Sequence, residues 1–128
     1  TAPLTGIGLG GFRYEVFRPS PGFNVSPLAE IPHAHNTFVQ TALDLGIPGL
    51  ISYLALLLVG LALAWRTYHS AAAPVDRMLA LGLGGTLIAV HLFGLLDAIA
   101  LGAKVGLFLW WGLGVLSALH HTARSTQS

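Results

Sequence analysis

An unbroken apolar run at residues 45–65 constrains the fold of this chain more than any other part of its sequence. The run is 21 residues long and contains no Asp, Glu, Lys or Arg. A helix rises about 1.5 Å per residue, so a helix of this length spans the hydrocarbon core of a bilayer, which is about 30 Å thick. Charged residues make up only 9% of the chain, against roughly 25% of an average soluble domain. We therefore expect an integral membrane protein.

Two more apolar stretches follow the first. Residues 78–96 have His91 as their single ionisable residue, and residues 98–119 have Lys104 near their start. The sequence thus predicts an all-α integral membrane protein, and because its first loop begins abruptly we expect the C-terminal part of a larger one. Its predicted parts are an extracytoplasmic Gly/Pro-rich loop with a short amphipathic helix at 1–44, a three-helix transmembrane segment at 45–119 (helices at about 45–65, 78–96 and 98–119) and a cytoplasmic tail at 120–128.

Basic residues near the predicted helix ends indicate the orientation in the membrane. Arg66 and Arg77 border the loop between the first two helices, and Arg124 lies in the tail. On the opposite side only Lys104 lies close to a helix end. Cytoplasmic loops carry an excess of Lys and Arg, so we expect the loop and the tail in the cytoplasm and residues 1–44 outside it.

Composition excludes several classes of function. The net charge is +1 and the six Lys and Arg residues are scattered, which argues against nucleic acid as a partner. The absence of cysteine excludes disulfides, thiolate catalysis and Cys-based zinc sites. Membrane lipids remain as the expected surroundings of the helices.

The first loop is interrupted by glycine and proline, so we expect little regular structure before residue 34. One exception is the segment 12–17, FRYEVF, whose alternation predicts a short strand or an extended segment at the membrane interface. Residues 36–45 predict a short helix. Its apolar face would consist of Phe38, Thr41, Ala42 and Leu45. Gly46 is expected to end this helix in a left-handed cap, and Pro48 suits the first turn of the next helix.

A polar cluster, HAHN at residues 33–36, precedes the short helix. His35 and Asn36 would lie at or just before its N-terminus, where free N–H groups and the helix dipole favour an anion. A histidine with an ordinary pKa near ~6.5 can accept a proton at neutral pH. His33 could join His35 in binding a metal, but Glu30 is the only nearby Cys, Asp or Glu that could complete such a site, so we expect no metal.

These residues carry a resemblance to a known family. His35-Asn36, nine residues, then Gly46-Ile47-Pro48-Gly49 resembles the H-[N/S/Q]-x9-GxxG signature of the bacterial O-antigen ligase and polymerase family. The stretch GIGLGGF at 6–12 is similar to the Gly-rich approach to the last large periplasmic loop of those proteins. The resemblance implies a multi-pass inner-membrane glycosyltransferase of the GT-C type. Its glycan donor would be an undecaprenyl-diphosphate-linked oligosaccharide, and its acceptor would be lipid A–core, another glycan or another hydroxyl, without any cofactor.

The resemblance implies a role for His35, and the chemistry of neighbouring residues suggests roles for four others. His35 matches the signature histidine and is the candidate catalytic base, although it could instead cap the helix or bind the loop. Asn36 could orient a sugar hydroxyl or His35, and it has an equally good structural reason as an N-cap. His33 is expected to contact the substrate. Arg13 and Arg18 are candidate diphosphate-binding residues, since guanidinium groups match phosphate oxygens, although interfacial arginines also meet lipid headgroups.

Two ionisable residues stand out in or near the predicted membrane segments. We expect Asp97 to pair with Lys104 and His91 to make a hydrogen bond between helices. Small residues in the second and third helices should allow close packing: Gly82, Gly84, Gly85, Gly102, Gly106, Gly112 and Gly114. A transporter with a His91–Asp97 relay, or a structural membrane segment without catalysis, remains an alternative. The GxGxxG pattern at 6–11 lacks a βαβ context, so we expect a close-approach turn there rather than a dinucleotide site.

Overall fold

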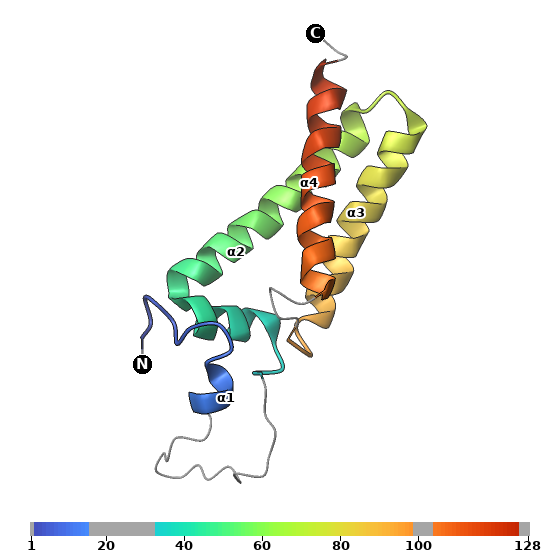
Figure 1. The fold of residues 1–128 in the computed structure, drawn as a ribbon. Helices are drawn as coiled ribbons and strands as arrows, with labels where there is room; N and C mark the ends of the chain where they lie inside the picture. The colour runs from blue at the N-terminus through green and yellow to red at the C-terminus, as the bar shows by residue number, and fades with distance from the viewer. Residues whose placement is uncertain (1, 16–32, 99–103, 126–128) are drawn as a thin grey trace. The chain divides into compact units, whose positions relative to one another are not determined.

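The computed structural model describes residues 2–15, 33–98 and 104–125 (Figure 1). Its regular elements are α1 (Phe12–Glu15), α2 (Thr37–Ser70), α3 (Pro74–Phe93) and α4 (Lys104–Ser125), and the described residues contain no strand. The chain divides into two compact units. Unit 1 is Thr1–Tyr53 with Gly94–Ala98, and unit 2 is Leu54–Phe93 with Ile99–Ser128. The all-helical class predicted from the sequence agrees with the described part of the chain.

Helix α1 corrects the strand predicted in the segment 12–17. The N–H groups of Tyr14 and Glu15 donate to the carbonyl of Gly11 at 3.0 and 3.1 Å, and Gly11 itself donates to Gly8 at 3.0 Å. A glycine turn thus leads directly into one helical turn. The strand prediction was wrong because the alternation of apolar and polar residues covers too few residues to decide between a strand and a helix. Residues 16 and 17 lie outside the described residues.

Helix α2 consists of two helical pieces joined at Gly46, as the sequence predicted. Gly46 has φ 74° and ψ −176°. This is the extended positive-φ region that is essentially reserved for glycine, rather than the left-handed helical cap that we expected. Pro48 lies two residues later, in the first turn of the second piece, where its missing N–H leaves no helical hydrogen bond unmade.

The first piece of α2 buries a polar face, which corrects the predicted apolar face. The buried residues are Thr37, Gln40, Thr41 and Asp44, whereas Leu45 is exposed. Their side chains are hydrogen bonded: Gln40 Nε2 donates to Asp44 Oδ1 at 2.8 Å, and Thr41 Oγ1 donates to the Thr37 carbonyl at 2.7 Å. Because buried polar groups need such partners, this face is built for a protein environment and not for lipid.

The N-terminal residues bind across the kink in α2. Ile7 N–H donates to the Leu43 carbonyl at 2.7 Å, and Ile47 N–H donates to the Pro3 carbonyl at 2.8 Å. The two glycines at this contact have no room for a side chain. A Cβ on Gly46 would lie 2.7 Å from the Leu4 carbonyl, and one on Gly6 would collide with the Asp44 carbonyl. The predicted close-approach turn is therefore confirmed at Gly6.

Unit 2 contains residues 54–70 of α2 together with α3 and α4 (Figure 1). Its core residues are Ala64, Ala80, Leu87, Leu109 and Leu116. Among the predicted packing glycines, Gly84 lies at a close contact, because a Cβ there would come within 2.9 Å of the Ala64 Cβ. Gly82, Gly85 and Gly114 face open space instead. The sequence identified the helices that pack closely but not which of their glycines make the contact.

Two described helices, α2 and α3, are long and apolar enough to cross a membrane. Helix α4 overlaps the predicted helix at 98–119 and is not among the candidate membrane spans found in the described residues. It is described from Lys104 and continues through residues that we had assigned to the tail. Large apolar side chains remain exposed on all three helices, including Leu58, Met78, Leu92, Phe108 and Trp111. Such surfaces suit lipid or further helices rather than water.

The Gly84 contact gives a direct test of the packing in unit 2. We expect Gly84→Leu to destabilise the protein by about 1–3 kcal/mol, the usual cost of overpacking, because the new side chain would collide with Ala64. Thermal unfolding in detergent measures the effect. Gly85→Leu is the matched control, since a Cβ at Gly85 meets nothing within 4 Å. Equal unfolding temperatures for the two variants would contradict the α2–α3 contact.

Candidate functional site

Three ionisable side chains meet in unit 1, although they come from distant parts of the sequence. Asp97 Oδ1 lies 3.2 Å from His35 Nδ1 and 3.5 Å from His33 Nδ1. The two imidazole rings are also in contact, with their centroids 4.5 Å apart and their planes at 63°. We call His33, His35 and Asp97 the histidine–aspartate cluster. It replaces the predicted pairing of Asp97 with Lys104, since these histidines are the ion-pair partners of Asp97 among the described residues.

Backbone hydrogen bonds bring Asp97 to the histidines. The segment that follows α3 lies against the start of α2, where Thr37 N–H donates to the Gly94 carbonyl at 2.7 Å. Asn36 Nδ2 donates to the Leu95 carbonyl at 3.1 Å, and Thr37 Oγ1 donates to the Asp97 carbonyl at 3.2 Å. Three hydrogen bonds thus hold residues 94–97 beside the HAHN sequence, so the position of the carboxylate is set by the backbone as well as by its own charge.

Asn36 acts as the N-cap of α2. Its Oδ1 accepts hydrogen bonds from the N–H groups of Phe38 and Val39, both at 3.0 Å. With Thr37 N–H bound to Gly94 and Gln40 N–H bound to Asn36 O at 2.8 Å, the first four N–H groups of the helix all have partners. The anion site that we expected at this N-terminus is therefore already filled by protein groups. Asn36 thus caps the helix and binds the Leu95 carbonyl.

His35 combines an exposed ring with a strained backbone. Its side chain is 66% exposed, whereas that of His33 is 31% exposed. Its φ of 48° makes it the one non-glycine residue with positive φ in the described part of the chain. For a side chain of this size the left-handed conformation costs of order 1–3 kcal/mol, and such strain concentrates at functional sites. The surrounding hydrogen bonds hold an accessible imidazole in a conformation that it would not adopt alone.

The charge of Asp97 determines the tautomer of His35. A hydrogen bond from Ala98 N–H at 2.8 Å, then one from His35, and the charges of both histidines lower the pKa of the Asp97 carboxyl below its ordinary value. An ionised carboxylate only accepts hydrogen bonds, so His35 Nδ1 is the donor in this pair. The lone pair on the exposed ring then belongs to Nε2, which is the arrangement of a carboxylate-oriented base.

The other predicted site residues are less constrained. Arg13 lies on α1 with an exposed side chain, and Arg18 and Glu30 lie outside the described residues.

His91 is buried in α3, where its Nδ1 donates to the Leu87 carbonyl at 2.7 Å. This bond runs within the helix, and a bond from His91 to another helix stays a prediction. The sequence had singled out Asp97, but nothing in the sequence indicated that it lies beside the two histidines.

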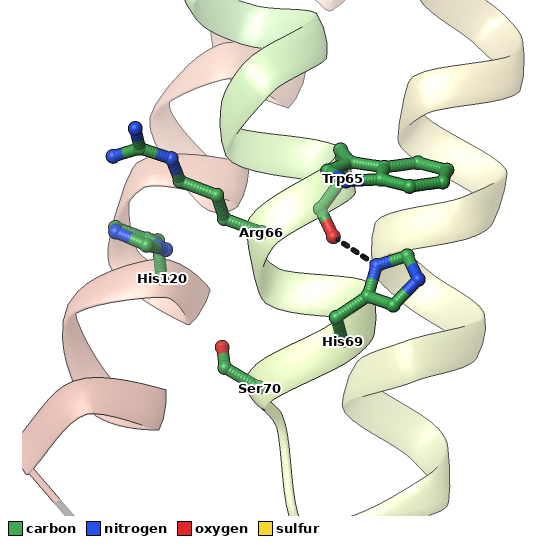
Figure 2. Close-up of a pocket in the computed structure, with 5 residues that line it drawn as sticks. All are labelled: Trp65, Arg66, His69, Ser70 and His120. Carbon is green, nitrogen blue, oxygen red and sulfur yellow. Dashed lines mark hydrogen bonds between the residues drawn. The ribbon is translucent and has the colours of Figure 1, made fainter.

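A polar concavity of about 460 Å³ lies in unit 2 (Figure 2). Its lining residues are Trp65, Arg66, His69, Ser70 and His120. His69 Nδ1 donates to the Trp65 carbonyl at 2.8 Å, as Figure 2 shows, and His120 Nδ1 lies 3.3 Å from Thr67 Oγ1. No carboxylate is among the lining residues, so this concavity lacks the acid–base pair of the histidine–aspartate cluster.

Fold and site together define an all-helical protein, over its described residues, with two helices long and apolar enough to cross a membrane. A carboxylate-paired histidine precedes its glycine-kinked helix. Residues 1–54 match the family model of O-antigen ligases, which supports membership of the chain in that family. This confirms the resemblance that the signature indicated. No curated protein and no solved structure matches the chain. The matched residues include His33 and His35 but not Asp97, which the fold supplies from beyond them.

Proposed function

We propose that this protein is a membrane glycosyltransferase of the O-antigen ligase or polymerase type, acting in the biosynthesis of a surface polysaccharide such as lipopolysaccharide or exopolysaccharide. It would transfer a glycan from an undecaprenyl-diphosphate-linked oligosaccharide to lipid A–core, to another glycan or to another hydroxyl acceptor. The observation that carries this proposal is the hydrogen bond from His35 Nδ1 to Asp97 Oδ1 at 3.2 Å, beside the family signature.

The reaction requires little covalent chemistry from the protein. The bond between the anomeric carbon and the diphosphate oxygen breaks, and a bond from the acceptor oxygen to that carbon forms. The acceptor proton goes to His35 Nε2, whose lone pair is free because Nδ1 carries the proton bound to Asp97. The diphosphate is already a good leaving group, so positioning the acceptor and taking up its proton are the main tasks. Asp97 acts through His35 by orienting it and stabilising its charged form.

The diphosphate of the glycan donor needs cationic partners in this proposal. The N–H groups at the start of α2 are occupied, so side chains must supply the positive charge. Arg13 and Arg18 remain the proposed diphosphate-binding residues, and His33, half-buried beside His35, is a proposed substrate contact. The proposed partners are thus the lipid-linked oligosaccharide, its hydroxyl acceptor and membrane lipids.

The proposed location is the inner membrane of a bacterium, with the histidine–aspartate cluster on its periplasmic side. Arg66, at the end of α2, and Arg77, near the start of α3, favour the cytoplasm for the loop between these helices. Arg77 Nε also donates to the Ala71 carbonyl at 2.7 Å, so its charge stays at this turn. We propose α4 as a third spanning helix, which would place its C-terminal end in the cytoplasm.

A transfer assay tests the function. Membranes containing the protein are supplied with an undecaprenyl-diphosphate-linked glycan, with or without lipid A–core. Glycan attached to lipid A–core would support a ligase, and longer lipid-linked glycan formed without it would support a polymerase. If neither product exceeds that of membranes lacking the protein, the proposal is refuted. A transporter would instead move the glycan across the bilayer without forming a new glycosidic bond.

The role of Asp97 gives a separate prediction. Asp97→Asn keeps the shape of the side chain but no longer fixes the proton on His35 Nδ1, so we expect kcat to fall by about tenfold to a hundredfold, less than for loss of the base itself. KM for the glycan donor should not change, and Asp97→Glu should recover part of kcat. The control is Asp76→Asn, in the first turn of α3, which should leave transfer unchanged. A rise in KM at constant kcat would argue against a positioning role.

A further inference from the structure

The histidine–aspartate cluster has a feature that acid–base catalysis does not use. His33 Nδ1 is buried and has no hydrogen-bond partner among the described residues, although it faces Asp97 Oδ1 at 3.5 Å. Leaving such a nitrogen buried without a hydrogen bond is unfavourable. A ligand that occupied the space between the three side chains would remove this cost.

The distances in the cluster match those between ligands of one metal ion. Zinc lies 2.0–2.2 Å from its nitrogen and oxygen ligands, so two ligands of a tetrahedral site are about 3.3 Å apart. The Asp97–His35 and Asp97–His33 distances are 3.2 and 3.5 Å, and the ligand atoms of all three residues lie within 4.8 Å of one another. Two of the three distances between ligand atoms therefore already match those of a zinc site.

We propose that His33, His35 and Asp97 bind a single divalent transition-metal ion of the zinc type. Three protein ligands would leave the remaining coordination position to water, as in open zinc sites. Asp97 is prepared as a ligand, because its carboxylate is ionised and also accepts a hydrogen bond from Ala98 N–H at 2.8 Å. Two imidazoles select zinc, cobalt, nickel or copper over magnesium and calcium, which prefer oxygen ligands.

The sequence alone argued against this site because Glu30 was the only nearby carboxylate. The fold provides the missing ligand from the segment after α3, 62 residues beyond His35. The same hydrogen bonds that hold this segment against Asn36 and Thr37 fix the carboxylate ligand before any metal binds. The site is therefore largely formed in advance.

Metal binding would also prevent His35 from acting as the proposed base. This consequence rests on the proposed function. A metal ion on His35 Nδ1 displaces the proton there, and the neutral ring then carries its proton on Nε2. Such a ring cannot accept the acceptor proton. Zinc should therefore inhibit transfer, and a chelator should restore it. Binding of the metal itself does not depend on glycan transfer, so the two proposals can fail separately.

Titration of the detergent-purified protein, prepared without a histidine tag, tests the site. Co²⁺ gives visible absorption bands in a site with nitrogen ligands, and displacement by Zn²⁺ reports the affinity for zinc. We expect one equivalent to bind, with a hundredfold excess of Mg²⁺ having no effect. His33→Ala and Asp97→Asn should each weaken binding by about tenfold or more, the scale that even outer groups of a metal site contribute. His69→Ala, which removes an imidazole of unit 2, should not.

Each outcome decides the proposal. Absence of stoichiometric binding by the wild type, or equal affinity in wild type, His33→Ala and Asp97→Asn, would overturn it. To separate lost ligands from lost folding, thermal unfolding is followed with EDTA and with Zn²⁺. Zinc should raise the unfolding temperature of the wild type and of His69→Ala but not that of the two cluster variants. A rise of the same size in all four proteins would also overturn the proposal.

Discussion

Replacing His35 with alanine is expected to lower glycan transfer by about 10²–10⁴-fold, the usual contribution of a general base. The loss should appear in kcat, because the imidazole takes the acceptor proton during bond formation, and binding of the lipid-linked glycan donor should persist. Single-turnover transfer at matched expression measures this directly. Unchanged transfer would move the search for the base to another part of the protein.

The backbone at His35 calls for a second variant. Alanine does not readily adopt φ 48°. His35→Ala alone could therefore lose activity because the loop changes conformation and not because the imidazole base is missing. Asparagine adopts this conformation more readily than most residues, yet it cannot accept the proton. We expect His35→Asn to fold at least as well as the wild type and to be as inactive as His35→Ala. Activity close to wild type in His35→Asn would show that this position is structural. His69→Ala serves as the histidine control and should retain full transfer.

Replacing Gly46 with alanine should cause the largest loss of stability in unit 1. A non-glycine residue at φ 74° and ψ −176° is strained by about 1–3 kcal/mol. The new Cβ would in addition lie 2.7 Å from the Leu4 carbonyl, so either the kink or the bound N-terminal residues must move. We expect a lower unfolding temperature and faster proteolysis of residues 2–8 in detergent.

Gly82→Ala is the matched control for this substitution. Gly82 lies inside α3, where a Cβ meets nothing within 4 Å. Alanine is favoured over glycine in a helix by about 1 kcal/mol, so this variant should be as stable as the wild type or slightly more so. If Gly46→Ala were equally stable, the glycine of the signature would have a role other than its backbone conformation.

The parts of the fold that sequence predicted well depend on neighbouring residues. Asn36 before a helical pattern predicted the N-cap, and Gly46 followed by Pro48 predicted the break in α2, because caps and kinks are set by one or two side chains. The long apolar helices were predicted because a run of apolar residues is itself a local feature of the sequence. In contrast, the alternation in FRYE pointed to a strand, although the glycine turn before it directs one helical turn.

The features that the sequence missed depend on contacts between distant segments. Thr41 was assigned to an apolar face, whereas it is buried in a polar one, because neighbouring segments and not periodicity decide which face is covered. Asp97 was paired with Lys104, seven positions along the chain, whereas its partners His33 and His35 are brought near by hydrogen bonds of the backbone around Gly94. No local pattern records such a contact, so the place of Asp97, one of the three residues of the cluster, could be found only from the structure.

The division of the site between two segments also limits how this protein can be recombined with its relatives. The family match ends at residue 54, and a chimera that exchanged only those residues would carry His35 and Asn36 without the chain that receives their hydrogen bonds. Residues 94–98 would have to be exchanged with them as a second, non-contiguous piece. In this protein the unit of exchange is therefore a pair of segments that are distant in the sequence.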